Sequence, residues 1–210
     1  MKGWGLEKRW LALLEHFGVP SEEARAAFEE VARRYRQGHR VYHTLAHVQY
    51  VLEMVARLAG EAEHLQRVQV AAWLHDVVYD PRAGDNEERS AAYAARLLGK
   101  LGLAQQVISD VQRLILHTIA HQAQEGDGDA CVLLDADLAI LGEAPATYRT
   151  YARAIRREYG WLSDEAYRDG RMEVLEGFLA RKHIYCTPLL RAEREVRARR
   201  NLAQEIDALS

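Results

Sequence analysis

Apolar residues recur at i, i+3 and i+4 along nearly all of the chain, and no stretch shows the strict alternation typical of a β-strand. This spacing gathers apolar side chains on one face of an α-helix, which can then be buried against other helices. The 210 residues are enough for one large domain. We therefore expect an all-α fold.

The expected helix starts are marked by side chains that cap a first turn. Thr44, Ser163 and Thr187 each directly precede a periodic apolar segment, as N-cap residues do. Asp85, with Glu88 three residues later, has the pattern of a capping box. These positions divide the chain into several helices joined by short loops.

Composition excludes several classes of protein. The formal net charge of −3 argues against a general nucleic-acid binder, so we expect no sequence-specific nucleic-acid partner. The apolar runs are too short to span a membrane, and the first ten residues lack the apolar core of a signal peptide. Cys131 and Cys186 have no metal-binding spacing, and we expect them to be reduced and structural. These features predict a cytoplasmic protein with no membrane partner.

The segment 61–79 contains the most constrained feature, the adjacent pair His75 and Asp76. Apolar residues fall on two faces of this segment, so we expect one long helix in the middle of the bundle. The pair would then be buried near the protein's centre. An ionisable side chain that is buried without a partner costs roughly several kcal/mol, so this pair needs a compensating group.

Other polar residues are also expected to face inward. His47, His121 and Asp137 each continue the apolar stripe of their own predicted helix. His43 lies four residues before His47, and would share its face if both were helical. His117 lies nearer the edge of its stripe.

Asp135 and Asp137 are two residues apart, so they point to nearly opposite sides of a helix. Asp135 is therefore either a partner behind the site or an acid on the helix surface. Taken alone, an inward histidine is usually a hydrogen-bonded core residue. Because four separate helices each place a His or Asp on a buried face, one shared divalent metal ion becomes the leading explanation.

The order His47, then His75-Asp76, then Asp137 resembles the HD-domain superfamily of metal-dependent phosphohydrolases. The segments YHTLAHV (42–48), WLHDVVYDP (73–81), DNEERSA (85–91) and LLDADLAILG (133–142) occur in the expected order. Residues 40–206 look like a bacterial subfamily of predicted HD phosphohydrolases.

The resemblance implies a multi-helix HD-domain bundle around a buried metal site, as a single domain over residues 1–210. Its core would span about 40–145, with N-terminal helices in 6–37 and C-terminal helices in 146–209 packed on it. The implied cofactor is one or two divalent ions per site. Mn, Fe, Ni, Co, Zn and Mg all remain open, because His and carboxylate ligands do not separate them.

Distant similarity to the cyclic-nucleotide phosphodiesterases suggests individual roles. Their Tyr-His-Asn-x-x-His motif resembles YHTLAHV, with Thr44 in place of Asn, which implies that His43 donates a proton and His47 binds metal. Their Ala-Asp-Leu-Ser motif resembles residues 136–139 and favours Asp137 over Asp135 as the ligand. No match to their purine-binding glutamine and aromatic residue is identified.

The expected site is thus a set of metal ligands with a catalytic group and phosphate-binding cations beside them. The metal ligands implied are His47, His75, Asp76 and Asp137; the catalytic residues are His43, Asp76 and Glu87; the second-metal or supporting residues are His117, His121 and Asp135; and the phosphate-binding cations are Arg40, Arg89 and Lys182. Glu87 has an alternative role in compensating a helix dipole, and each cation an alternative as an ordinary surface charge.

The resemblance implies a phosphohydrolase that cleaves a small phosphate ester with metal-activated water. A nucleotide is one candidate substrate, and phosphomonoesterase and phosphodiesterase activity both remain open. The alternatives are a di-iron oxygenase on an HD fold and a non-catalytic nucleotide-binding regulatory module. A ferritin-like bundle needs two Glu-x-x-His motifs, and Glu61 to His64 supplies one. The oligomeric state is left open.

Overall fold

The computed structural model describes residues 3–210, which contain ten α-helices, two short 3-10 helices and no strand. The prediction of an all-α fold is therefore confirmed. The elements in chain order are α1 (Gly3–His16), α2 (Ser21–Tyr35), α3 (Leu45–Arg57), η1 (Ala59–Glu61), α4 (Leu65–Leu74), α5 (Asn86–Lys100), α6 (Gln105–His117), α7 (Gly128–Leu138), η2 (Ala139–Gly142), α8 (Pro145–Glu158), α9 (Asp164–Leu179) and α10 (Pro188–Leu209).

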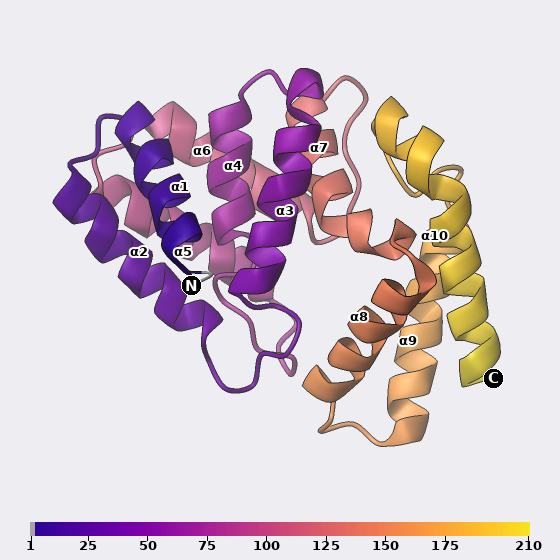
Figure 1. The fold of residues 1–210 in the computed structure, drawn as a ribbon. Coiled ribbons are helices and arrows are strands. Elements are labelled where there is room, and N and C mark those ends of the chain that lie inside the picture. Colours follow the sequence, from indigo (N-terminus) through magenta and orange to yellow (C-terminus); the bar gives the residue numbers. More distant parts are fainter. Residues whose placement is uncertain (1–2) are drawn as a thin grey trace.

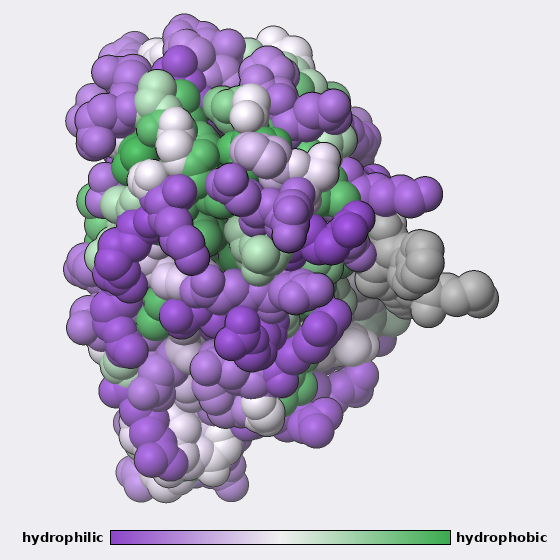
Figure 2. Space-filling model, turned by 90° about the vertical axis from the view of Figure 1, so that its left-hand side faces the viewer, coloured by the Kyte–Doolittle hydropathy of each residue, from purple (hydrophilic) through white to green (hydrophobic). Residues whose placement is uncertain are grey.

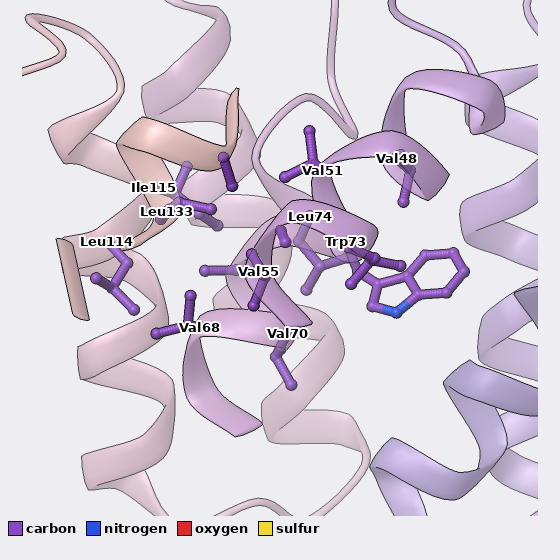
Figure 3. Packing of buried hydrophobic residues seen from close by; sticks show 14 of the residues in the cluster. Val48, Val51, Val55, Val68, Val70, Trp73, Leu74, Leu114, Ile115 and Leu133 are labelled. Carbon is purple, nitrogen blue, oxygen red and sulfur yellow. The ribbon is translucent and has the colours of Figure 1, made fainter. Parts of the chain in front are cut away.

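Helix α4 lies in the middle of the bundle, as its two apolar faces predict. It contacts α3, α6 and α7 around its circumference, and α1 and α5 pack against it as well. Figure 3 shows the resulting core, in which Val68 and Leu74 of α4 lie among side chains of α3, α6 and α7. Both side chains are fully buried. The C-terminal end of α4 is thereby fixed deep in the molecule.

The first two and the last three helices flank this central group on opposite sides (Figure 1). On one side, Trp10 of α1 packs edge-on against Trp73 of α4, with ring centroids 5.3 Å apart. On the other side, α8 and α10 pack against η2, and α9 packs against α10. The close approach of α10 depends on Gly142, where an added Cβ would lie 2.6 Å from Cβ of Arg194.

Polar side chains cover most of the face formed by the left-hand side of Figure 1, and apolar side chains show between them in the upper half of that view (Figure 2). This distribution is expected for amphipathic helices packed around one core. No helix among residues 3–210 combines the length and the apolar character needed to cross a bilayer.

The prediction of one helix over residues 61–79 is wrong, because α4 ends at Leu74. Pro81 has no N–H to donate to the carbonyl of Val77, and proline disfavours helical geometry at the residue before it. The carbonyls beyond the helix end are instead satisfied by a side chain: Arg40 donates to the carbonyls of Asp76 and Val77 at 2.8 and 3.2 Å. His75 is the C-cap residue of α4, and Asp76 lies in the turn that follows.

Three of the four predicted capping groups are confirmed. The hydroxyls of Thr44, Ser163 and Thr187 accept hydrogen bonds from backbone amides in the first turns of α3, α9 and α10. The capping box at Asp85 and Glu88 is wrong, since the Asp85 side chain makes no capping bond. Its backbone is not extended, with ψ of 27°, and its carboxylate pairs with Arg89 instead.

Candidate metal centre

The end of α4 aims one nitrogen of His75 into the interior. Nδ1 of His75 lies 3.0 Å from the carbonyl oxygen of Ala72. Because a carbonyl can only accept, Nδ1 carries the proton of the neutral ring, and Nε2 is left with a lone pair. The side chain is 1% exposed. The backbone bond thus fixes the ring with Nε2 directed at the cluster described next.

Three side chains from three elements converge on that nitrogen. Nε2 of His47, on α3, lies 3.2 Å from Nε2 of His75 and 3.2 Å from Oδ1 of Asp137, on α7. Oδ1 of Asp137 lies 3.6 Å from Nε2 of His75. Asp76 adds a second carboxylate, with Oδ2 3.1 Å from Nε2 of His75 and 3.6 Å from Nε2 of His47. The structure therefore brings all four predicted metal ligands together.

The spacing of these atoms fits a single metal ion. Ligand atoms about 2.1 Å from one ion, at angles of roughly 90 to 110°, lie about 3.0 to 3.4 Å from one another. One ligand atom from each of His47, His75 and Asp137 lies within 4.8 Å of the others, so a small movement closes the set around an ion. Two imidazoles and a carboxylate suit several first-row transition metals.

The charges of the cluster also fit a cation. Burial alone would raise the pKa of Asp137, but hydrogen bonds from His121, His47 and His75 hold it well below its usual range. Burial alone would lower the pKa of His75, but Asp76 and Asp137 raise it well above its ordinary value. The two carboxylates thus favour positive charge at this point. A divalent ion supplies that charge and leaves both rings neutral, as metal ligation requires.

His47 has fewer hydrogen-bond partners within the protein than His75 has, because only the Nδ1 atom of His75 is bonded to a backbone carbonyl. Burial lowers the pKa of His47, against the opposing effect of Asp137. Its Nδ1 is buried and has no hydrogen-bond partner among the described residues.

Two further predicted residues lie near the cluster. Nε2 of His121 lies 3.1 Å from Oδ2 of Asp137, whereas His47 pairs with Oδ1 of the same carboxylate. The backbone of His121 has φ of +47°, a strained conformation for a residue with a side chain, and Arg181 donates to its carbonyl at 2.7 Å. Glu87, at the start of α5, lines the same cavity, and burial raises its pKa.

Two other predicted supporting residues lie elsewhere. Asp135 points away from the cluster and accepts hydrogen bonds from the amide of Cys186 and from the amide and hydroxyl of Thr187, at 2.6 to 2.7 Å. It thereby anchors the start of α10. His117 donates from Nδ1 to the carbonyl of Gln122 at 2.9 Å and does not line the cavity.

His43 is oriented by a carboxylate that sequence reasoning did not find, Glu158 at the end of α8. Nδ1 of His43 lies 2.7 Å from Oε2 of Glu158, which also accepts from the hydroxyl of Tyr79 at 2.9 Å. Because the carboxylate accepts, Nε2 of His43 is turned toward Asp76, 4.0 Å from Oδ2. Burial opposes protonation of His43, but Asp76 and Glu158 outweigh it and raise its pKa.

None of the three predicted phosphate-binding cations lines the cavity. Arg40 is 6% exposed and donates to three backbone carbonyls, including that of His43. Arg89 is exposed and pairs with Asp85, and the exposed Lys182 does not line the cavity.

The cluster forms one end of a cavity of about 1000 Å³ between the central helices and the pair α8 and α9. His43, His75, Asp76 and Asp137 line this end. Side chains of α8 and α9 supply much of the opposite wall, and Figure 1 shows these two helices facing the central group. The volume is at the upper end for a small-molecule site.

The HD domain family model matches residues 40–165, more than half of the chain. The chain belongs to the HD domain family. Comparison with curated proteins and with solved structures gives no match. HD domains bind divalent metals and are generally metal-dependent hydrolases, and the cluster of His47, His75 and Asp137 could hold such an ion. The predicted superfamily is confirmed, and the bacterial subfamily stays a prediction.

Proposed function

We propose that this HD domain is a metal-dependent phosphohydrolase that cleaves a small phosphate ester. The observation that carries the proposal is the convergence of His47, His75, Asp76 and Asp137 at the end of a large cavity. A buried metal-ligand set beside an open cavity leaves space for a substrate and for water. A purely structural metal site is usually closed by its ligands.

In this proposal the four converging side chains hold the metal. When bound, a divalent ion lowers the pKa of water and stabilises negative charge on phosphoryl oxygens. Oδ2 of Asp76 lies 3.1 Å from Nε2 of His75 and 4.0 Å from Nε2 of His43. The proton donor is therefore next to a metal ligand.

His43 is the residue placed to protonate the leaving oxygen. Its Nδ1 is held by Glu158, so the proton that can be transferred is the one on Nε2, which faces the cavity. A raised pKa keeps this imidazole protonated at a higher pH than an ordinary histidine, as a general acid requires. Glu158 positions the ring through its bond to Nδ1, and Tyr79 donates to the same carboxylate oxygen and so helps to hold Glu158 in place.

The proposal is tested by metal content and by turnover in the same preparations. Wild-type protein should bind close to one equivalent of Mn, Fe, Co, Ni or Zn at micromolar concentration, measured by elemental analysis after dialysis. His75→Ala and Asp137→Ala should each lose most of it. His117→Ala is the matched control, because His117 donates to a backbone carbonyl outside the cavity, and should keep the metal.

Turnover is then followed as phosphate release from a panel of monoesters and diesters with each metal added in turn. Release by wild type and by His117→Ala, but not by His75→Ala, is the expected result. The hypothesis of a metal centre is falsified if wild-type protein binds no divalent ion at micromolar concentration. The hypothesis of a phosphohydrolase fails if the metal-loaded protein releases phosphate from no ester in the panel.

A di-iron oxygenase is the second candidate, and the position of His121 favours it. Nε2 of His121 lies 3.1 Å from Oδ2 of Asp137, so these two side chains could hold a second ion. Tightly bound iron near two equivalents with visible absorption, both lost in His121→Ala, would support this candidate. A colourless protein that releases phosphate would exclude it.

A further inference from the structure

A second cavity borders the side chains that hold His43. It has a volume of about 670 Å³, and both Tyr79 and Glu158 line it. Tyr79 also lines the cavity beside the metal cluster, but none of the four converging metal ligands lines the second cavity. Tyr79 and Glu158 therefore lie between two cavities that are lined by different kinds of side chain.

Four arginines from separate segments line the second cavity, which we call the arginine pocket. Arg34 and Arg157 lie in the last turns of α2 and α8. Arg82 lies in the loop between α4 and α5, and Arg89 lies on α5. The fold thus brings cationic side chains that are far apart in the sequence to one hollow.

Three of these arginines have no carboxylate partner. Other arginines among residues 3–210, including Arg89, form ion pairs within 4.0 Å, but Arg34, Arg82 and Arg157 form none. The guanidinium of Arg34 lies 4.1 Å from the ring centroid of Tyr93, and that of Arg82 lies 5.6 Å from the ring centroid of Trp161. An aromatic face orients a guanidinium group without neutralising its charge, so its N–H donors can still bind an anion.

The carboxylates that line the arginine pocket do little to offset this charge. Glu158 is 4% exposed, and its oxygens accept hydrogen bonds from backbone amides, from His43 and from Tyr79. Asp80 is exposed, and its Oδ1 accepts from the backbone amide of Arg82 at 3.0 Å. Three unpaired guanidinium groups therefore face one exposed carboxylate, which gives the hollow a positive potential.

The shape of the arginine pocket favours a small ligand. Its volume lies within the range of about 300 to 1000 Å³ that is typical of small-molecule sites. The chain as a whole has a formal net charge of −3, which does not favour a long polyanion such as a nucleic-acid strand. A guanidinium group can bind two phosphate oxygens at once. Three such groups around one hollow suit a compact ligand with more than one phosphate group.

We propose that the arginine pocket binds a small anion with two or more linked phosphate groups, and that Arg34, Arg82 and Arg157 hold it. The anion lies outside the cavity of the metal cluster, next to the side chains that position His43. The inference therefore goes beyond the proposed hydrolase and does not depend on its activity.

Binding is measured by calorimetry on the whole chain, with tripolyphosphate and inorganic phosphate as probes at constant ionic strength. The protein is dialysed against EDTA and then against buffer, because metal ions in solution would bind the probes. Tripolyphosphate should bind at least about 10-fold more tightly than inorganic phosphate, since one further hydrogen bond to a charged group is worth about that factor or more. Equal affinity for the two probes, or no binding of tripolyphosphate up to about 1 mM, would overturn the proposal.

The location is tested with Arg82→Gln and Arg157→Gln, both at exposed positions. Each should weaken tripolyphosphate about 10-fold or more, and circular dichroism should show an unchanged helical fold. Arg9→Gln, at an exposed position on α1, and Arg181→Gln, in the metal cavity, are the controls and should each change affinity less than about 2-fold. Undiminished binding in both pocket variants, or an equal loss in Arg181→Gln, would refute the assignment to the arginine pocket.

A macromolecular polyanion is the competing occupant. A single-stranded DNA of about 20 bases, titrated in the same buffer, should bind more weakly than tripolyphosphate, because only a small part of such a strand fits the hollow. If the DNA binds about 10-fold more tightly than tripolyphosphate and Arg82→Gln weakens it, the pocket belongs to a nucleic-acid surface and the proposal is wrong.

Discussion

Glu158 is the residue whose replacement has the most distinctive expected outcome. Its carboxylate is 4% exposed and accepts five hydrogen bonds, three of them from the consecutive backbone amides of Val41, Tyr42 and His43 at 2.7 to 3.0 Å. The other two come from Nδ1 of His43 and the hydroxyl of Tyr79. Burial alone would raise its pKa, but these donors lower it from 4.5 to about 2.

The pKa gives the size of the effect. One pKa unit is equivalent to about 1.4 kcal/mol, so the lowered pKa corresponds to about 3 kcal/mol of stabilisation of the ionised carboxylate. Because the folded-state pKa lies below the unfolded value, this stability is complete above the unfolded pKa and is lost as the pH falls toward the folded pKa. Less than half of it should remain at about pH 3.

Glu158→Gln keeps the shape but removes the charge, and it turns donors toward His43 and Tyr79. We expect it to lower the free energy of unfolding by about 2 to 3 kcal/mol at about pH 7, and Tm by roughly 5 to 10 °C for a domain of this size. The difference from wild type should shrink by about half at about pH 3. Glu15→Gln, an exposed carboxylate on α1, is the control and should change stability by less than about 0.5 kcal/mol.

Thermal unfolding followed by circular dichroism at both pH values measures these differences. An unchanged Tm at neutral pH, or a Tm difference that is the same at both pH values, would refute the reasoning from the buried carboxylate. The phosphate-ester assay adds a second readout, because loss of the Glu158 charge lowers the pKa of His43. The alkaline limb of the pH profile of kcat should therefore move to lower pH in the variant.

The remaining predictions concern the site and its support. His43→Ala should keep its metal by elemental analysis but slow turnover about 100-fold or more, as loss of a general acid does. Asp135→Ala should leave three buried donors unpaired at the start of α10, which costs about 2 to 4 kcal/mol by denaturant unfolding, yet metal content should not change. Asp137→Ala should show the opposite pattern, in which the metal content falls and the free energy of unfolding changes less than in Asp135→Ala. Gly142→Ala should destabilise the fold by about 1 to 3 kcal/mol, since the new Cβ would lie 2.6 Å from Cβ of Arg194.

The all-α fold could be predicted because the helices carry their own periodic apolar patterns, and α3, α9 and α10 also carry the N-cap residues that the sequence marks. The two-faced pattern of 61–79 similarly indicates a central helix, and α4, which lies within this segment, is central. The end of α4 was predicted too far along, because apolar residues continue through Val78 and outweighed the signal from Pro81. Periodicity records which side chains are buried, and it does not record whether the backbone around them is helical.

The convergence of these side chains was predictable because His47 and Asp137 each lie on an otherwise apolar stripe, and the pair His75 and Asp76 interrupts a segment that is apolar on two faces. Glu158 and His43 are 115 residues apart, and no local pattern connects them. The sequence around Glu158 reads as an ordinary helix C-terminus. A partner that is chosen by packing of α8 against the loop before α3 has no signature within either segment.

Arg40 shows why proximity in sequence is a weak guide to a cation's role. It was predicted to bind phosphate because it lies three residues before His43. Its guanidinium instead closes the open end of α4, where the carbonyls of Asp76 and Val77 lack helical amides. A buried carbonyl needs a donor as surely as a phosphate does, and the carbonyls nearest the site are fixed by the fold. Arg40 therefore contributes to the site by holding Asp76 in position.

The same limit applies to the tyrosines of α8. Tyr148 and Tyr151 are three residues apart on α8, so they lie on the same face of this helix. In the fold, Tyr148 is 3% exposed and bonds Glu205, whereas Tyr151 lines the cavity. What separates them is whether another side chain or open space faces the ring. Because an apolar face packs equally well against a helix or a ligand, a cavity wall is indistinguishable from core until the opposite wall is in place.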